Sequence, residues 1–241
     1  MQFIKYANAN ILTLLTSLFN VAQIGYSADK ISIDAFFGSF ESKHNITKTV
    51  IEDKIIAYKG DNVKVGMIFY PGANVDYTSY EPLMAACAEL GIMSFVFKMP
   101  LNVALLDIDA AKEIKGKFPE IKDWYIGGHS LGGVAAGMYI AKHLDEFKGL
   151  ILFASFIINN VSESNLKVLT LYGSEDKVLN INLYNIFKQY LPAHFKEIVI
   201  EGGCHACFGM YGTQKGDGIP TISNAEQIKF TAAQISKFLE E

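Results

Sequence analysis

Arginine is absent from this chain of 241 residues, because all 21 of its basic residues are lysines. Arginine supplies the planar guanidinium group that binds carboxylate and phosphate groups through paired hydrogen bonds. Lysine offers a single point charge in its place. The absence of arginine therefore disfavours substrates that are recognised mainly through carboxylate or phosphate groups.

A basic surface is also missing. The formal net charge is −4 at pH 7, and the sequence pI is about 5.8. Proteins that bind nucleic acid carry clusters of positive charge, which attract the phosphate backbone. We therefore expect no nucleic-acid partner.

Cysteine is scarce, with Cys87, Cys204 and Cys207 as the three examples. An odd count suits reduced thiols better than a framework of disulfides. The Cys204-x-x-Cys207 pair could be a redox pair or half of a zinc site, but no second cluster of Cys and His completes a tetrahedral set. We interpret these cysteines as small apolar residues and expect no metal and no bound cofactor.

Residues 1–28 contain a stretch, residues 11–24, whose apolar and polar residues lie on opposite faces of a predicted helix. This amphipathic helix is too short and too polar to span a bilayer. No small-x-small cleavage pattern follows it, because Tyr26 is bulky. Four interpretations stay open: packing on the domain, packing against a second copy in a homodimer, an anchor on a membrane surface, and a degenerate signal. Localisation therefore stays open between the cytoplasm and the membrane or cell envelope.

Residues 29–241 have the length and composition of a single domain, since half of the chain is hydrophobic. Residues 29–40 are predicted to form a short helix. Two runs rich in β-forming residues flank an acidic turn within residues 47–58, which predicts a hairpin at one edge of a sheet.

Beyond the hairpin, short apolar runs alternate with segments of helical periodicity. Strands are predicted at 63–70, 92–97, 123–129, 150–154, 168–172 and 197–200, and helices at 77–90, 104–117, 131–146, 181–191 and 224–240. This alternation predicts a doubly wound, mostly parallel α/β sheet with helices on both faces. Ligands bind such sheets at the carboxyl ends of the strands.

The most informative motif is Gly128-x-Ser130-x-Gly132, which lies between a predicted strand and a predicted helix. It matches the nucleophile elbow, a sharp turn that exposes the hydroxyl of a serine in a strained backbone conformation. The two glycines are needed because a Cβ there would collide with the strand or the helix. The alternative is a structural serine at the start of a helix.

A serine nucleophile needs a base, and the base needs an orienting carboxylate. Asp176 follows the strand predicted at 168–172, and its position favours it over the neighbouring Glu175. His205 lies in the loop after the last predicted strand. The order Ser, Asp, His is the one expected on this fold. No such loop contains the other histidines, which are His44, His129, His143 and His194. In the glycine-rich tail of the His205 loop, three residues are candidates for shaping the pocket, although solvated loop is the favoured interpretation: Tyr211, Gln214 and Asp217.

With these residues the chain resembles the α/β-hydrolase superfamily, especially its small single-domain members without a cap, which are similar to dienelactone hydrolases. The resemblance covers about residues 50–240, and Gly128-His129-Ser130-Leu131-Gly132-Gly133 is its most specific part. It implies that Ser130 is the nucleophile, His205 the general base and acid, and Asp176 the carboxylate that orients His205. Dienelactone hydrolases use a cysteine nucleophile, so Ser130 departs from them and indicates serine-esterase chemistry.

An oxyanion hole in such an enzyme would use two main-chain N–H groups. One belongs to Leu131 at the start of the helix, and the other to Ala73 in the loop after the strand predicted at 63–70. Gly72 permits the tight turn of this loop. Candidates for contact with the substrate are Gly72, Asn74, Lys98 and Asn102.

The sequence therefore predicts a serine hydrolase that cleaves a small-molecule carboxylic ester through an acyl-enzyme intermediate, with a thioester or amide as alternatives. The link between Ala154 and Val168 is too short for a large cap domain. We therefore expect an open pocket and small or exposed acyl groups. Two other functions stay open: an acyltransferase that uses the same triad, and a non-catalytic binding protein that kept the fold.

Overall fold

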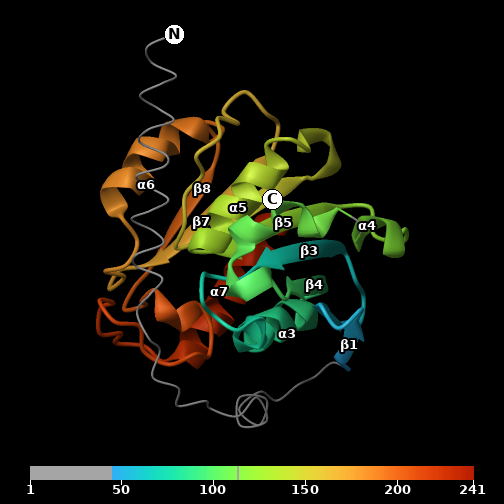
Figure 1. The fold of residues 1–241 in the computed structure, drawn as a ribbon, viewed down its shortest axis with the longest axis horizontal. Helices are drawn as coiled ribbons and strands as arrows, with labels where there is room; N and C mark the ends of the chain where they lie inside the picture. The colour runs from blue at the N-terminus through green and yellow to red at the C-terminus, as the bar shows by residue number, and fades with distance from the viewer. Residues whose placement is uncertain (1–44, 113) are drawn as a thin grey trace.

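A computed structural model of the chain describes residues 45–112 and 114–241. These residues contain an eight-stranded sheet with the order β1-β2-β4-β3-β5-β6-β7-β8 (Figure 1). Strands β3 to β8 are parallel, whereas β1 and β2 pair in antiparallel fashion at one edge. The predicted mostly parallel α/β sheet is confirmed. The helices predicted at 11–24 and 29–40 lie outside the described residues.

Each predicted strand is present, with small shifts at its ends. The bounds are β1 (Thr47–Ile51), β2 (Ile55–Lys59), β3 (Val65–Tyr70), β4 (Ile92–Phe97), β5 (Trp124–His129), β6 (Gly149–Phe153), β7 (Lys167–Gly173) and β8 (Lys196–Ile200). The predicted hairpin is formed by β1 and β2. Its acidic residues Glu52 and Asp53 adopt positive φ angles of 52° and 51°, as tight hairpin turns require.

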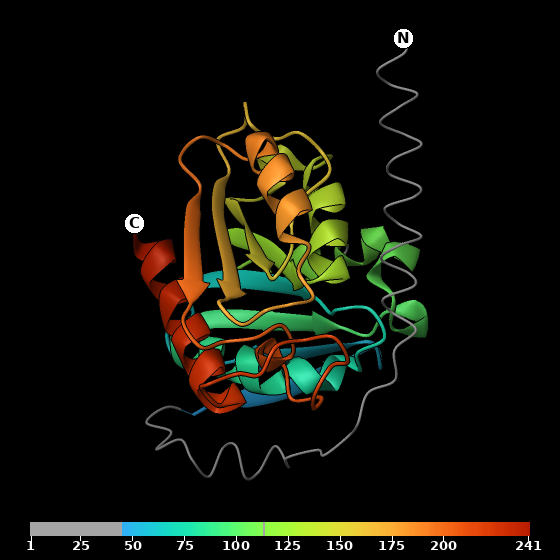
Figure 2. The ribbon, with the colours of Figure 1, turned by 90° about the vertical axis from the view of Figure 1, so that its left-hand side faces the viewer.

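Helices cover both faces of the sheet (Figures 1 and 2). One face carries α3 (Glu81–Glu89) and α7 (Asn224–Glu240), which lie side by side. The other face carries α4 (Ile114–Lys117), α5 (Leu131–Ile140) and α6 (Ile181–Phe187). The C-terminal helix begins at a capping box in which Ser223 and Glu226 bond to each other's main-chain N–H.

The central strands are buried on both faces, which explains their nearly continuous apolar sequences. All residues of β3, β4 and β5 are buried. Along β3, Met67 and Phe69 pack toward α3 and α7, while Ile68 and Tyr70 pack toward α5. The alternation of strand side chains therefore divides the core into two layers.

The continuous helix predicted at 104–117 is wrong. Short 3-10 turns precede α4 in this region, and Asp107 has a non-helical φ of −148°. The hydroxyl of Tyr70 donates to the carbonyl of Ile108 (2.7 Å) and accepts from the N–H of Ala111 (2.9 Å). A buried side chain thus takes the place of helical hydrogen bonds. The turns are η2 (Pro100–Asn102), η3 (Ala104–Leu106) and η4 (Ile108–Ala111).

Three other predicted helices are shorter than expected. The helix predicted at 77–90 begins as a 3-10 turn, and its α-helical part covers only Glu81–Glu89. The helix predicted at 131–146 ends at Ile140, where the chain turns so that Tyr139 stacks on His143 and packs edge-on against Phe147. The helix predicted at 181–191 continues after α6 only as a 3-10 turn. The remaining turns are η1 (Tyr77–Tyr80), η5 (Leu144–Glu146), η6 (Lys188–Tyr190) and η7 (Ala206–Phe208).

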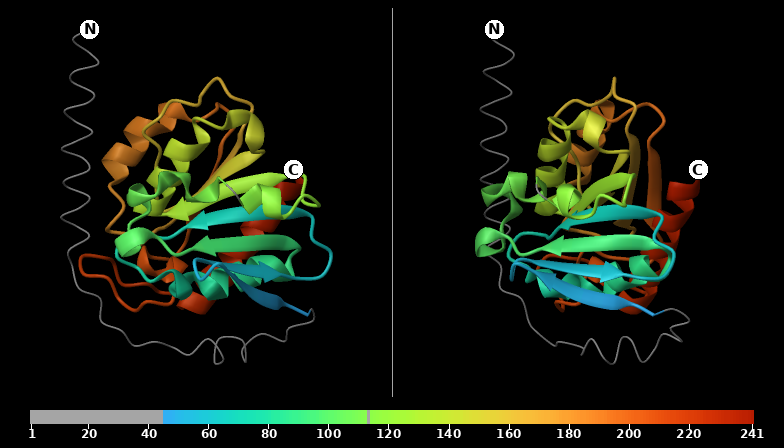
Figure 3. Two further views of the ribbon diagram at one scale, coloured as in Figure 1. Left: turned by 45° about the vertical axis from the view of Figure 1, so that its right-hand side comes forward. Right: turned by 90° about the vertical axis from the view of Figure 1, so that its right-hand side faces the viewer.

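The sheet is strongly twisted: Figure 2 shows β7 and β8 running across the direction of β3 and β4. Figure 3 shows β1 and β2 in blue at the edge opposite β8. Residues 155–166, which connect β6 to β7, form neither helix nor strand, so no large cap is inserted there. Across the described ranges, no helix has the length and hydrophobicity needed to cross a membrane.

Candidate active site

Ser130, the predicted nucleophile, lies between the last residue of β5 and the first residue of α5. Its backbone has φ 52° and ψ −123°, a strained conformation for a residue with a side chain. The N–H of Ser130 donates to the carbonyl of Phe153 on β6 (2.9 Å), and the hydroxyl of Ser155 donates to the carbonyl of Ser130 (2.6 Å). The end of β6 and the segment that follows it therefore hold the strained serine by both of its main-chain groups.

The glycines of the motif are required by close approaches between backbones. A Cβ on Gly128 would lie 2.5 Å from the carbonyl carbon of Gly132, at the start of α5. A Cβ on Gly132 would overlap the carbonyl oxygens of Tyr70 and Pro71 at the end of β3. The turn therefore packs against a neighbouring strand as well as against its own helix.

Asp176 and His205 meet at the carboxyl ends of β7 and β8. The Nδ1 atom of His205 lies 2.9 Å from Oδ2 of Asp176, and both side chains are almost fully buried. Oδ1 of Asp176 accepts from the N–H groups of Val178 and Leu179, each at 2.8 Å. Burial opposes ionisation of Asp176, but the charge of His205 and these hydrogen bonds lower its pKa below the usual value. The ionised carboxylate is thus held in a fixed orientation toward the imidazole.

The second ring nitrogen of His205 is open to a new partner. Its Nε2 atom is buried and has no hydrogen-bond partner within the part of the chain that the structure describes. The ring centroid of His205 lies 4.5 Å from that of His129, the residue that precedes Ser130. His205 is therefore close to the strained turn in space, although 75 positions separate it from Ser130 along the chain.

The His205 loop is held by two polar residues. The carboxylate of Asp217 accepts from the N–H groups of His205 (3.3 Å) and Ala206 (2.8 Å). The side chain of Gln227, fully buried on α7, accepts from the N–H of Cys204 and donates to its carbonyl, both at 3.0 Å. The interpretation of Asp217 as solvated loop is therefore wrong.

The interpretation of Tyr211 as solvated loop is also wrong, because its side chain is buried beside Tyr80 and His129. Sequence reasoning also missed Tyr80, Ser155 and Gln227. These residues belong to no sequence motif, because each contacts a main-chain group or a ring elsewhere in the chain.

The loop after β3 contains the second predicted oxyanion donor, Ala73. Ala73 packs against the apolar cluster that includes Leu131, the first predicted donor. On one side of Ala73, the N–H of Gly72 donates to the hydroxyl of Tyr80 (3.1 Å). On the other side, Asn74 has a φ of 59°, and its N–H donates to the carbonyl of Asn102 (2.8 Å). The two loops that follow β3 and β4 are therefore joined.

The remaining substrate candidate, Lys98, stands apart from these contacts. It is exposed, and its N–H donates to the carbonyl of Lys54 in the hairpin turn (2.7 Å). Glu175, the alternative carboxylate, bonds to the hydroxyl of Ser174 at 3.3 Å instead of approaching His205. Among the other histidines, His143 pairs with a surface glutamate and His194 is exposed, while His44 lies outside the described residues.

The cysteines are free and buried. The Sγ atoms of Cys204 and Cys207, which precede and follow His205 in the sequence, lie 3.2 Å apart. Burial raises the pKa of Cys87 to about 12. Residues 45–112 and 114–241 contain no group of three or more His, Cys, Asp or Glu side chains arranged to hold a metal ion.

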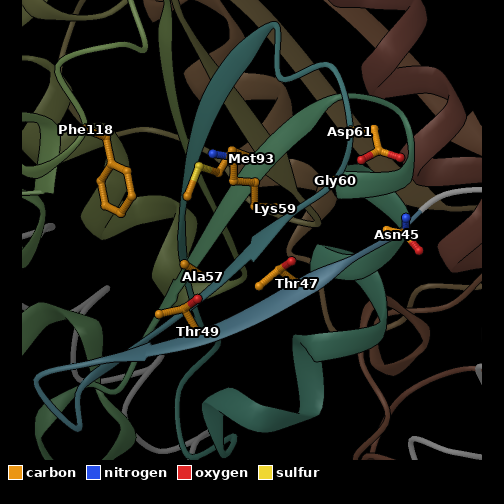
Figure 4. A pocket seen from close by; sticks show the side chains of 9 residues that line it. All are labelled: Asn45, Thr47, Thr49, Ala57, Lys59, Gly60, Asp61, Met93 and Phe118. Carbon is orange, nitrogen blue, oxygen red and sulfur yellow. The ribbon is translucent and has the colours of Figure 1, made fainter.

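A pocket of about 410 Å³ lies away from these residues, on the β1–β2 side of the sheet (Figure 4). Strand order places it at the edge opposite β7 and β8, which carry Asp176 and His205 on their following loops. It is lined by Asn45, Thr47, Thr49, Ala57, Lys59, Gly60, Asp61, Met93 and Phe118. This pocket is separate from the strained serine.

Comparison with solved structures finds the same fold. A protein described as a predicted CIB-like hydrolase from Thermoplasma acidophilum superimposes with a TM-score of 0.57 at 15% identity, covering 80% of this chain and 99% of its own. TT1662 from Thermus thermophilus superimposes with a TM-score of 0.59 at 13% identity, covering 83% of this chain and 99% of its own. At such identities the likeness concerns the fold alone.

Sequence comparison identifies the family. No curated protein sequence matches the chain. A family model described as the alpha/beta hydrolase family matches residues 66–229, which is more than half of the chain and includes the elbow, Asp176 and His205. This protein therefore belongs to the alpha/beta hydrolase family, and its family membership makes it a hydrolase.

Proposed function

We propose that this hydrolase is a serine esterase, which cleaves a carboxylic ester with Ser130 as nucleophile, His205 as general base and acid, and Asp176 as the orienting carboxylate. The observation that carries the proposal is the buried Asp176–His205 pair, in which Nε2 of His205 has no partner among the described residues. A histidine that is oriented through Nδ1 and open at Nε2 is arranged to take a proton from a neighbouring hydroxyl.

The chemistry begins with attack of the Ser130 hydroxyl oxygen on the ester carbonyl, while Nε2 of His205 takes the hydroxyl proton. Asp176 keeps the other proton on Nδ1 and stabilises the imidazolium that forms. The tetrahedral intermediate then collapses, and the alcohol leaves with the proton from Nε2. Water, activated in the same way, hydrolyses the acyl-enzyme to release the acid and regenerate the serine.

Negative charge on the tetrahedral oxygen would be stabilised by the N–H groups of Leu131 and Ala73. Leu131 is the first residue of α5, where the helix dipole and the N–H groups of the first turn favour negative charge. Contacts of Gly72 with Tyr80 and of Asn74 with Asn102 hold the loop on both sides of Ala73. Each well-placed donor contributes a rate factor of about 10² to 10³.

The substrate is proposed to have a small or exposed acyl group. The β6–β7 link forms no cap, so nothing in that segment encloses a long chain. The lack of arginine supports a neutral ester over a substrate held mainly by its carboxylate or phosphate groups.

The test is labelling with a fluorophosphonate probe, which reacts with activated serines. The intact protein should be labelled, whereas Ser130→Ala and His205→Ala should not. Ser162→Ala, in the β6–β7 link, is the matched control and should keep full labelling. A series of p-nitrophenyl esters of increasing chain length then measures the preferred acyl group. Absence of labelling in the folded, intact protein would refute serine chemistry at this site.

A further inference from the structure

A buried tyrosine connects the loop after β3 to the residue beside the nucleophile. The hydroxyl of Tyr80 lies 3.1 Å from the N–H of Gly72 and 2.8 Å from Nδ1 of His129. Both side chains are almost completely buried. The ring of Tyr80 packs against Phe69 and Tyr211, with centroids at 4.9 and 6.1 Å, so packing fixes its position independently of the hydroxyl.

Chemistry fixes the direction of the Gly72–Tyr80 hydrogen bond, whereas the direction of the Tyr80–His129 bond depends on the tautomer of His129. The N–H of Gly72 can only donate, so the hydroxyl oxygen of Tyr80 accepts from it. We assign His129 the tautomer that carries its proton on Nε2, in which Nδ1 accepts the hydroxyl proton of Tyr80. Burial and the nearby charge of His205 lower the pKa of His129 well below its ordinary value, which keeps the ring neutral.

On its other side His129 supports the predicted general base. The ring centroids of His129 and His205 lie 4.5 Å apart with a tilt of 48° between the planes. Phe208, in the same loop as His205, packs against the His129 ring at 5.6 Å. The ring of His129 therefore forms part of the surface on which the His205 loop rests.

Position 72 must be glycine for this arrangement to exist. A Cβ there would lie 2.8 Å from Nδ1 of His129 and 2.9 Å from the hydroxyl of Tyr80. These distances are shorter than a carbon atom tolerates, so any side chain at this position would displace the pair or the loop. The loop carrying Ala73, the Tyr80 hydroxyl and the His129 ring are thus in direct contact.

We propose that Tyr80 and His129 are positioning residues, which couple the loop carrying the Ala73 donor to the ring of His205. The proposal rests on the proposed serine esterase function. Tyr80 holds the loop through Gly72, and His129 connects that hydrogen bond to the face of the general base. Neither side chain touches the reacting atoms. Both act by keeping the N–H of Ala73 and the imidazole of His205 at fixed positions relative to Ser130.

This coupling predicts that loss of the Tyr80 hydroxyl lowers kcat and leaves KM nearly unchanged. Tyr80→Phe removes the hydroxyl but keeps the ring, so the loop loses one hydrogen bond while the core stays filled. Since a whole oxyanion donor contributes about 10² to 10³ in rate, a displaced donor should lower kcat by about 10-fold to 10²-fold. KM should stay within about twofold, because the donor acts mainly in the transition state.

Substitutions at His129 separate its two roles. His129→Asn keeps an acceptor near the position of Nδ1 and should lower kcat less than His129→Leu, which removes both the acceptor and the imidazole. If the pair acts as a unit, Tyr80→Phe combined with His129→Leu should lower kcat no further than the more severe single variant. Independent, additive effects of the two substitutions would overturn the coupling.

The matched control is Tyr184→Phe. Tyr184 is another buried tyrosine, whose hydroxyl bonds to the hydroxyl of Thr170 at 2.7 Å. Its loss should lower the melting temperature about as much as Tyr80→Phe does, yet leave kcat unchanged. All kcat values are expressed per serine titrated with the fluorophosphonate, so that unfolded protein is not counted.

The outcomes are distinguishable. If the intact protein neither labels nor cleaves esters, the proposed function fails, and this inference fails with it. If the intact protein is active and Tyr80→Phe keeps its kcat per titrated site, only this inference is overturned. NMR of protein carrying ¹⁵N-labelled histidine provides a readout without turnover: His129 should carry its proton on Nε2. A proton on Nδ1 would contradict the hydrogen-bond directions given above.

Discussion

Replacing Asp176 by asparagine tests the Asp176–His205 pair with little change in shape. Oδ1 of Asp176 accepts two main-chain N–H groups, and an asparagine carbonyl can accept both of them. The amide NH₂ then faces Nδ1 of His205 in place of Oδ2. Because an amide NH₂ only donates, Nδ1 must become the acceptor, and the imidazole proton moves to Nε2.

That tautomer cannot accept a proton from Ser130. The expected loss in kcat is on the order of 10⁴, the size of effect that follows when a triad histidine is held in the wrong tautomer. The fold should survive, since the main-chain hydrogen bonds in the loop of residues 173–179 are retained. KM should change little, because Asp176 lies behind His205 and does not face the substrate.

The assay is p-nitrophenyl ester hydrolysis at several pH values, with the circular dichroism spectrum as a check on folding. Glu175→Gln is the matched control. Glu175 is adjacent in sequence and was the alternative carboxylate, but its side chain contacts Ser174 and not His205. Its substitution should leave kcat within about twofold. A folded Asp176→Asn variant with more than about a tenth of the normal kcat would refute the assigned role of the pair.

Three further predictions concern the scaffold of the site. Gly132→Ala places a Cβ on the carbonyl oxygen at the end of β3 and should abolish activity or folding. Gly116→Ala, whose Cβ would meet nothing within 4 Å beyond its chain neighbours and its own helix backbone, should keep full activity and raise the free energy of unfolding by about 0.5–1 kcal/mol. Gln227→Leu leaves the buried N–H and carbonyl of Cys204 unpaired, so the free energy of unfolding measured in urea should fall by about 2–5 kcal/mol. A decrease below about 0.5 kcal/mol would contradict this prediction. The lowered pKa of Asp176 stabilises the folded state above about pH 4, and this contribution disappears as pH falls through the lowered folded-state pKa. The stability gap between the natural protein and Asp176→Asn should therefore narrow below about pH 4 in urea titrations, and a gap independent of pH would contradict the assignment.

Local sequence was sufficient to predict the turn around Ser130. The apolar run of β5, the glycines at 128 and 132 and the small residues of α5 describe a strand, a tight turn and a helix in consecutive positions. A turn of this kind requires glycine wherever backbones approach, and glycine is visible in a sequence. The parallel sheet was predictable for a similar reason, because strands buried on both faces are continuously apolar.

Predictions failed or were missing where a side chain bonds to a distant main-chain group. The hydroxyl of Tyr70 replaces helical hydrogen bonds near Ile108, so that helical periodicity at 104–117 did not produce a helix. Asp217 and Gln227 hold the His205 loop, although neither belongs to a motif. Contacts of this kind depend on which loops the sheet order brings together.

Short segments of the sequence thus determine the turn around Ser130 and the strands after which Asp176 and His205 follow. Local sterics explain the turn, and hydrophobic periodicity explains the strands. The pairing of Asp176 with His205 was predicted from the sequence, but its geometry comes from the packing of the loops that follow β7 and β8. The contact of Tyr80 with Gly72 and His129 comes from packing alone. A buried polar group must find a partner, and which partner it finds depends on the completed fold.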